Sequence, residues 1–231
     1  MNKSYKTQLK PNREQISLFK KHLNASRFAF NWALGQKKES FDKKDKTPSG
    51  YALDKIFNKL KKTENTWLYE VSNTCHQEAI QDCDKAFQDF FRRCKKKQKG
   101  KKGFPKFKSK RNDKQSFRLK GFLHATKTHV KLPRIGWVRL KQRDYLPQNS
   151  KILSATVSHR AGRWFVSLNV EEEHIPLPKK EGIIGVDLGI KHTAVCSDGQ
   201  VFESPKPLAK YAKKLLRFSL CFVGTILNVI K

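Results

Sequence analysis

The segment that most restricts the fold of this chain runs from Gly182 to Phe202. It contains a nearly continuous apolar run, typical of a strand covered on both faces of a sheet; its members are Ile183, Ile184, Val186, Leu188 and Ile190. Asp187 stands inside this run, and a buried carboxylate is costly unless a cation or a hydrogen bond compensates it. Gly185 and Gly189 flank Asp187 and leave room for a ligand or another backbone. We therefore expect a buried strand with a compensated aspartate.

The residues after this strand predict a hairpin. A strand is expected at Thr193–Cys196, a tight turn at Asp198-Gly199 and a short strand at Gln200–Phe202. An inward Asp on a first strand, followed by two hairpin strands and a helix, resembles the start of ribonuclease-H-like domains, in which that Asp binds catalytic magnesium. Two alternatives stay open: a hairpin that tolerates an edge-facing Asp, and an actin-like ATPase, although Ile190 and Lys191 replace the phosphate-binding hydroxyls of that family.

The charge of the chain predicts a polyanionic partner. Its 231 residues carry 50 Lys and Arg against 20 Asp and Glu, a formal net charge of +30, for which nucleic acid is the usual partner. A membrane surface is the alternative, but no basic amphipathic helix dominates the sequence, and we expect no membrane. The five cysteines form no Cys-x-x-Cys pair, so no zinc site is predicted. Without a signal-peptide pattern, we expect a cytoplasmic protein associated with the nucleoid.

The first hundred residues predict a strand followed by helices. After a strand at Ser4–Leu9, Asn12 is expected to cap a helix that ends near His22, and a turn at 24–26 leads to a second helix over 26–43. This pattern favours either a helix-turn-helix or an ordinary helical hairpin. Further helices are predicted over 52–62 and 73–95, the latter with a core-facing stripe of Cys75, Ala79, Cys83 and Phe87.

The most basic segment, residues 92–111, holds twelve Lys or Arg and no acidic residue. Gly100, Gly103 and Pro105 exclude one continuous helix, and the one-signed charge with interleaved phenylalanines favours phosphate neutralisation and base stacking over a solvated linker. The predicted nucleic-acid-binding residues of this segment are Arg92, Arg93, Lys95, Lys96, Lys97, Lys99, Lys101, Lys102, Phe104, Lys106, Phe107, Lys108, Lys110 and Arg111.

Residues 115–173 predict short antiparallel strands. These are expected at 115–119, 129–132 and 137–140, and the clearest hairpin pairs 152–159 with 164–171 around Gly162. Such a set favours a small barrel, a surface often used for oligonucleotides. Residues 176–180 are expected to link it to the segment described first.

Several of these pieces, in this order, resemble TnpB, the OrfB-type transposon proteins related to type V CRISPR effectors. The matching pieces lie within residues 1–216 and are Tyr5–Pro11, Ser26–Trp32, Trp67–Val71, Asp84–Phe87 with Phe90-Phe91, Gly103–Lys108, Leu132–Val138 and Gly185–Lys191. Each is weak alone, but their order and spacing are specific.

The resemblance implies an α+β protein in which a helical recognition domain is inserted into an antiparallel β-barrel (wedge) domain, followed by a RuvC-like domain. The expected domains are residues 1–11 (first wedge strand), 12–95 (recognition), 96–180 (basic loop and barrel), 181–217 (partial RuvC) and 218–231 (apolar tail). The family implies transposition-associated DNA cleavage with guide RNA, DNA and magnesium as partners. By position Tyr51 and Gln77 would read a target-adjacent motif, and Asp187 would be the first catalytic and metal-binding carboxylate.

The sequence departs from this family after the first nuclease strands. RuvC-type sites need several carboxylates, yet the last acidic residue is Glu203, and the zinc ribbon expected between the later carboxylates is absent. Residues 218–230 are instead mostly apolar, and shorter than the roughly 20 residues of a membrane span. We therefore expect a truncated copy that binds nucleic acid without cutting it. The alternatives are a nuclease-dead regulator and a nuclease completed in trans.

Overall fold

The structure is a computed structural model that describes residues 1–96, 100, 103–111, 115–147, 150–173, 183–207, 209–212 and 216. The chain divides into two compact units, Met1–His174 and Ile175–Lys231. The predicted linker at 176–180 and the apolar tail at 218–231 lie outside the described residues.

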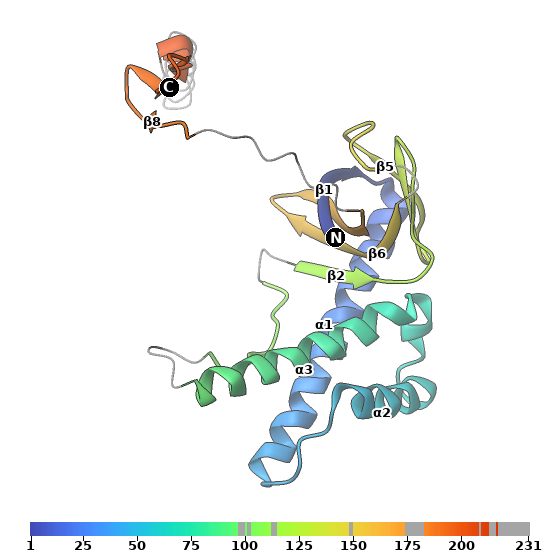
Figure 1. The fold of residues 1–231 in the computed structure, drawn as a ribbon. Helices are drawn as coiled ribbons and strands as arrows, with labels where there is room; N and C mark the ends of the chain where they lie inside the picture. Colours follow the sequence, from blue (N-terminus) through green and yellow to red (C-terminus); the bar gives the residue numbers. More distant parts are fainter. Residues whose placement is uncertain are drawn as a thin grey trace, which may run out of the picture. The chain divides into compact units, whose positions relative to one another are not determined.

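The first unit contains one antiparallel sheet with helices inserted in sequence after its first strand (Figure 1). The strands are β1 (Asn2–Lys10), β2 (Gln115–Leu119), β3 (His124–Ala125), β4 (His129–Leu132), β5 (Gly136–Leu140), β6 (Lys151–Arg160) and β7 (Arg163–Glu171), in the spatial order β2-β6-β7-β1-β5-β4-β3. Strand β1 thus pairs with β7 and β5, far along the chain. The α+β class is confirmed, while no pairing between described residues joins β2 to β3, so closure into a barrel stays a prediction.

The β6–β7 hairpin forms where the alternation of apolar residues predicted it. Its two-residue turn holds Ala161 at φ 47° and Gly162 at φ 71°, the left-handed geometry that matches the twist of the flanking strands. The alternate residues Val157, Val166 and Leu168 are buried. They form one core with Phe19 of α1, whose ring centre lies 4.8 Å from that of Trp164.

Helix α1 (Arg13–Asp42) is continuous over thirty residues, so the predicted turn at 24–26 is wrong. It begins at Asn12, as expected, with a capping box in which Asn12 and Gln15 exchange side chain–backbone hydrogen bonds. No Gly or Pro lies between Asn12 and Leu34, and Ala25 and Ser26 are buried. Packing of these small residues therefore favours continuation of the helix at the place where a local pattern predicted a break.

The remaining helices are α2 (Gly50–Thr63), the short η1 (Thr66–Glu70), which the sequence pattern did not predict, and α3 (Asn73–Lys95). The predicted apolar stripe of α3 is buried. Its members Ala79, Cys83 and Phe87 form a second core with residues of α1 and α2, whereas Cys75 belongs to the core of the sheet. The partners in the second core are Phe30, Leu34, Leu53 and Phe57.

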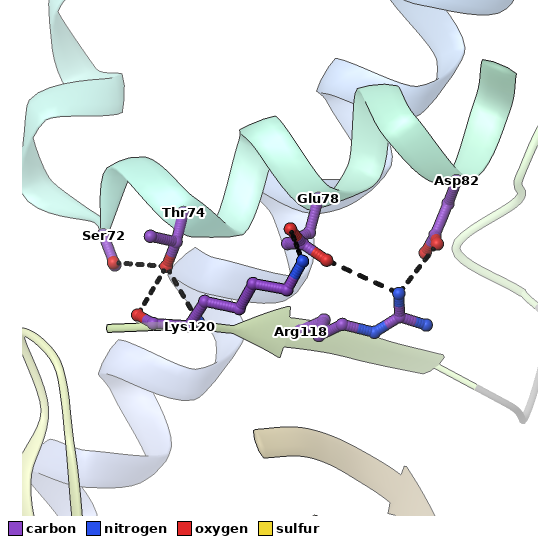
Figure 2. A network of polar contacts seen from close by, with 6 residues as sticks. All are labelled: Ser72, Thr74, Glu78, Asp82, Arg118 and Lys120. Atoms are coloured by element: carbon purple, nitrogen blue, oxygen red, sulfur yellow. Dashed lines mark hydrogen bonds and ion pairs between the residues drawn. The ribbon is translucent and has the colours of Figure 1, made fainter. Parts of the chain in front are cut away.

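A polar network joins α3 to β2 (Figure 2). Glu78, whose side chain is 11% exposed, lies 2.7 Å from the ammonium of Lys120 and 3.5 Å from the guanidinium of Arg118. Arg118 also reaches Asp82 at 3.1 Å. At the start of the helix, the Thr74 hydroxyl donates to the Lys120 carbonyl and accepts from its N–H. The helical part is thereby fixed to the edge of the sheet.

Two buried histidines lie near this joint. His22 accepts a hydrogen bond from the Ser72 N–H at Nε2, and its Nδ1 lies 2.8 Å from the Leu18 carbonyl. His76 is fully buried, and neither ring nitrogen has a hydrogen-bond partner among the described residues. Burial lowers the pKa of both imidazoles, that of His76 to about 4 from 6.5 with a further contribution from Lys61. Both histidines are therefore neutral in the folded protein at neutral pH.

The second unit contains a three-stranded sheet in the order β10-β9-β8, from β8 (Val186–Asp187), β9 (His192–Cys196) and β10 (Val201–Glu203). The predicted hairpin is present, with Gly199 at φ 87° in its turn. The predicted burial of the first strand is wrong: Ile183 is 100% exposed and Ile190 97%. The pattern suits a strand between two layers, but no described residue covers β8. No described helix combines the length and hydropathy needed to cross a bilayer.

We expect acid to destabilise the first unit through His76. The unfolded chain takes up this proton near pH 6.5 and the folded protein only near pH 4, because burial lowers the pKa of His76. Stability is therefore complete above pH 6.5 and falls as the pH drops through this window. The loss approaches about 3 kcal/mol at 1.36 kcal/mol per pKa unit. His76→Phe should flatten the pH dependence in urea unfolding between pH 7.5 and 4.5, and the exposed control His124→Phe should not. Superimposable profiles of wild type and His76→Phe would contradict this.

Candidate nucleic-acid interface

The first positively charged groove lies beside α1. Two pockets share Leu23 and Gln115 and therefore adjoin, and the larger has a volume of 500 Å³. Among the described residues, their lining includes four cations and no carboxylate. We call this surface the α1 groove, and its cations are Lys20, Arg27, Lys108 and Lys110. None of the four forms an ion pair with a described carboxylate.

One wall of the groove comes from the unbroken α1 helix. Lys20, Asn24, Arg27 and Asn31 follow one another at steps of four, three and four residues, which places them on one helix face. The Arg27 guanidinium donates to the Asn24 side-chain oxygen over 2.8 Å. Sequence reasoning missed Lys20 and Arg27 as binding residues. Their spacing would have revealed them, but the predicted turn at 24–26 divided the face.

The other wall is the C-terminal part of the basic segment, which is bound to the helices. Asn31 exchanges two hydrogen bonds with the backbone of Lys108, at 2.7 and 3.0 Å. The ammonium of Lys108 lies 3.9 Å from the centre of the Phe30 ring. Although Lys108 as a residue is exposed, its ammonium end is desolvated, which lowers its pKa. These contacts hold the backbone in place and direct Lys110 to the groove.

The predicted basic and aromatic residues fall into three groups. Phe104 packs edge-on against Phe87 and Phe90, with ring centres 5.5 and 5.1 Å away, so it anchors the segment. The exposed group comprises Arg92, Lys95, Lys96, Lys106, Phe107, Lys110 and Arg111. Within this group, Arg92 forms an ion pair with Asp89 at 2.8 Å. The partly buried Arg93 donates a hydrogen bond to the Gly103 carbonyl. Lys97, Lys99, Lys101 and Lys102 lie outside the described residues.

The two predicted motif readers lie on neighbouring helices. Tyr51, on the first turn of α2, is 78% exposed. The Gln77 amide on α3 donates to the carboxylate of Asp54 over 3.3 Å, and Asp54 lies three residues after Tyr51 on the same helix. Because α2 and α3 pack against each other, Tyr51 and Gln77 both lie in the helical part of the first unit. Gln77 is already hydrogen-bonded within the protein, to Asp54.

Asp187 lies on the exposed strand β8, paired with Val195. No three His, Cys, Asp or Glu side chains gather at a metal-binding distance among the described residues. A hard cation such as Mg²⁺ needs several oxygen ligands. The residues around Asp187 that the structure describes do not provide such a set.

Comparisons of the sequence with known proteins point to one family. Residues 1–46 match the HTH_OrfB_IS605 family model, described as a helix-turn-helix domain. A protein of Escherichia coli K12, named "Putative RNA-guided DNA endonuclease InsQ", is 30% identical over 218 residues, which are 93% of this chain and 52% of that protein. These similarities support the TnpB/OrfB family for this chain.

A second relative comes from Streptomyces pristinaespiralis and is named "Putative RNA-guided DNA endonuclease". It is 28% identical over 216 residues, covering 89% of this chain and 50% of its own. The chain therefore spans about half the length of these curated relatives. A Cas12f1 complex with guide RNA and target DNA aligns with a TM-score of 0.39 and 16% identity over 99% of this chain and 63% of that one. The predicted helix-turn-helix is confirmed by the family model that matches residues 1–46, which is described as a helix-turn-helix domain. The predicted position of its turn is wrong, because α1 is continuous through 24–26.

We expect the removal of two groove cations to weaken nucleic-acid binding and its salt dependence. Lys20→Gln with Lys110→Gln removes two unpaired charges from opposite walls of the groove. In fluorescence anisotropy with a labelled single-stranded RNA, the slope of log affinity against log salt should fall by about 1.4, roughly 0.7 for each phosphate that is no longer neutralised. The control Lys38→Gln with Lys55→Gln lowers the net charge equally at exposed positions outside the groove. Equal reductions for both pairs would show that only total charge matters.

Proposed function

We propose that these 231 residues form a TnpB-like protein segment that binds guide RNA and DNA and does not cleave DNA by itself. The supporting observation is the α1 groove, whose described lining residues include four cations and no carboxylate. A groove of one sign with low-dielectric walls concentrates the field and favours a phosphate backbone. The names of the relatives, which specify RNA guidance and DNA cleavage, supply the expected partners. Such a protein would act in the cytoplasm, at the nucleoid.

The groove could neutralise backbone phosphates, while base pairing by the guide would supply sequence recognition. The exposed ring of Phe107, beside Lys106, offers a surface for an unstacked base. Tyr51 and Gln77 remain the proposed readers of a target-adjacent motif, for which Gln77 would exchange its bond to Asp54 for a base edge.

A second candidate function is a nuclease completed by a further polypeptide segment. The apolar residues beside Asp187 favour it, because Ile183, Leu188 and Ile190 are exposed in the unit that carries this carboxylate. A covering layer would bury them and could bring further carboxylates to Asp187. In this alternative magnesium would bind only in the assembled site.

A cleavage assay separates the two proposals. The purified 231-residue protein, with guide RNA, matched DNA and Mg²⁺, should retain DNA in a mobility-shift assay and leave it uncut. Asp187→Ala should bind as well as wild type, because Asp187 lies outside the α1 groove. Cutting by wild type that Asp187→Ala abolishes would contradict the first proposal. Cutting that appears only when a downstream segment is co-expressed would support the second.

A further inference from the structure

A second cationic pocket lies where the N-terminus of α3 meets the β4–β5 hairpin. It has a volume of 380 Å³, and the part of its lining that the structure describes carries two basic side chains and no carboxylate. We call it the hairpin pocket; the lining residues that matter are Ser72, Asn73, Phe122, Lys131 and Arg134. It shares no lining residue with the α1 groove.

The hairpin holds Arg134 in an unusual conformation. Leu132 and Gly136 are paired across its base, while Leu132 and Val138 are buried in the sheet core. Arg134 has φ 64°, a left-handed conformation that non-glycine residues rarely adopt. Such strain is retained where the surrounding structure enforces it, often at binding sites. Here it places an exposed Arg134 at the pocket.

A third cation contacts one of the lining residues of the pocket. Lys61 of α2 is 3% exposed; its ammonium donates to the side-chain oxygen of Asn73 and lies 4.1 Å from the centre of the Tyr69 ring. Burial lowers its pKa, and nearby Arg134 lowers it further, with partial compensation by Asp54. None of Lys61, Lys131 and Arg134 forms an ion pair with a described carboxylate. A bound anion would reduce this repulsion.

Aromatic rings border the same pocket. Phe122 is 86% exposed, more than any other described aromatic side chain. Trp137 is 46% exposed, and the Lys131 ammonium lies 5.9 Å from the centre of its ring. Ser72 of the lining is hydrogen-bonded to Thr74, whose hydroxyl is hydrogen-bonded to the backbone of Lys120 (Figure 2). An exposed ring beside two cations suits one nucleotide.

We propose that the hairpin pocket binds one phosphate of a single-stranded nucleic-acid segment through Lys131, Arg134 and Asn73, with the adjoining base stacked on Phe122. This inference rests on the proposed function, since it assigns a further contact to the same nucleic-acid partner. Inorganic phosphate has the same charge chemistry, and stacking on Phe122 separates a strand from a free anion.

The test measures anisotropy of the full 231-residue protein with a labelled single-stranded RNA at several salt concentrations. Lys131→Gln combined with Arg134→Asn, where asparagine tolerates positive φ, should lower the salt slope by about 0.7, the value for one phosphate of a single strand. Phe122→Ser should leave the slope unchanged and weaken binding about 5- to 150-fold, the range for one stacked base. The weakening should be smaller for a duplex of the same length, whose bases are already stacked.

Matched controls lie outside the pocket. Arg139→Gln with Lys55→Gln removes two exposed basic side chains, and Phe41→Ser removes an exposed ring at the end of α1. Circular dichroism and thermal melting confirm that every variant folds. Inorganic phosphate at fixed ionic strength should compete with RNA for wild type and not for the Lys131/Arg134 variant.

Three results would overturn the proposal. If Phe122→Ser binds RNA like Phe41→Ser while phosphate still competes, the pocket takes a free anion and no strand. If all pocket variants match their controls, the hairpin pocket is not used, although RNA binding by the α1 groove stands. If wild type binds no nucleic acid, the proposed function fails together with this inference.

Discussion

The carboxylate of Glu78 joins the helices of the first unit to its sheet. It lies largely buried between Arg118 and Lys120, where charged groups attach α3 to the residues of strand β2 and its end. Removal of one partner from such a cluster leaves the others desolvated and unpaired, which costs more than the pair itself contributes. The His22 imidazole adds a second fixed point, since it joins α1 to the start of α3 through the Ser72 N–H. Both cationic pockets depend on this joint, because each has one wall on the helices and another on a strand or hairpin.

The distribution of charge follows from the small number of carboxylates. With 20 acidic residues against 50 basic ones, the protein places Glu78, Asp82 and Asp84 in ion pairs that join secondary-structure elements. The cations of the α1 groove and of the hairpin pocket then have no acidic partner among the described residues, and their mutual repulsion opposes folding. A phosphate backbone relieves that repulsion. This is the physical link between the internal ion pairs and the proposed nucleic-acid contacts.

Particular elements explain how far sequence reasoning reached. The α3 stripe and the β6–β7 hairpin are regular repeats of period 3.6 and 2 over many residues, and both formed as predicted. The prediction of a turn at 24–26 was wrong, because the local sequence cue at Asn24–Ser26 competes with the burial of Ala25 and Ser26. That burial depends on tertiary contacts, which no local pattern reveals. The apolar run around Asp187 has the composition of a buried strand, but burial depends on a covering layer that the described residues do not provide.

The sequence by itself predicted the α+β class, a polyanionic partner and the resemblance to the TnpB/OrfB family, because periodicity, net charge and ordered motifs are properties of the chain alone. Only the tertiary structure decided which cations act together. Lys20 and Lys110 are far apart in the sequence and share one groove, and Lys131 and Arg134 meet Asn73 of a different element. The physical reason is that a binding surface is defined by distances and by missing counter-charges, and both are set by packing between distant segments.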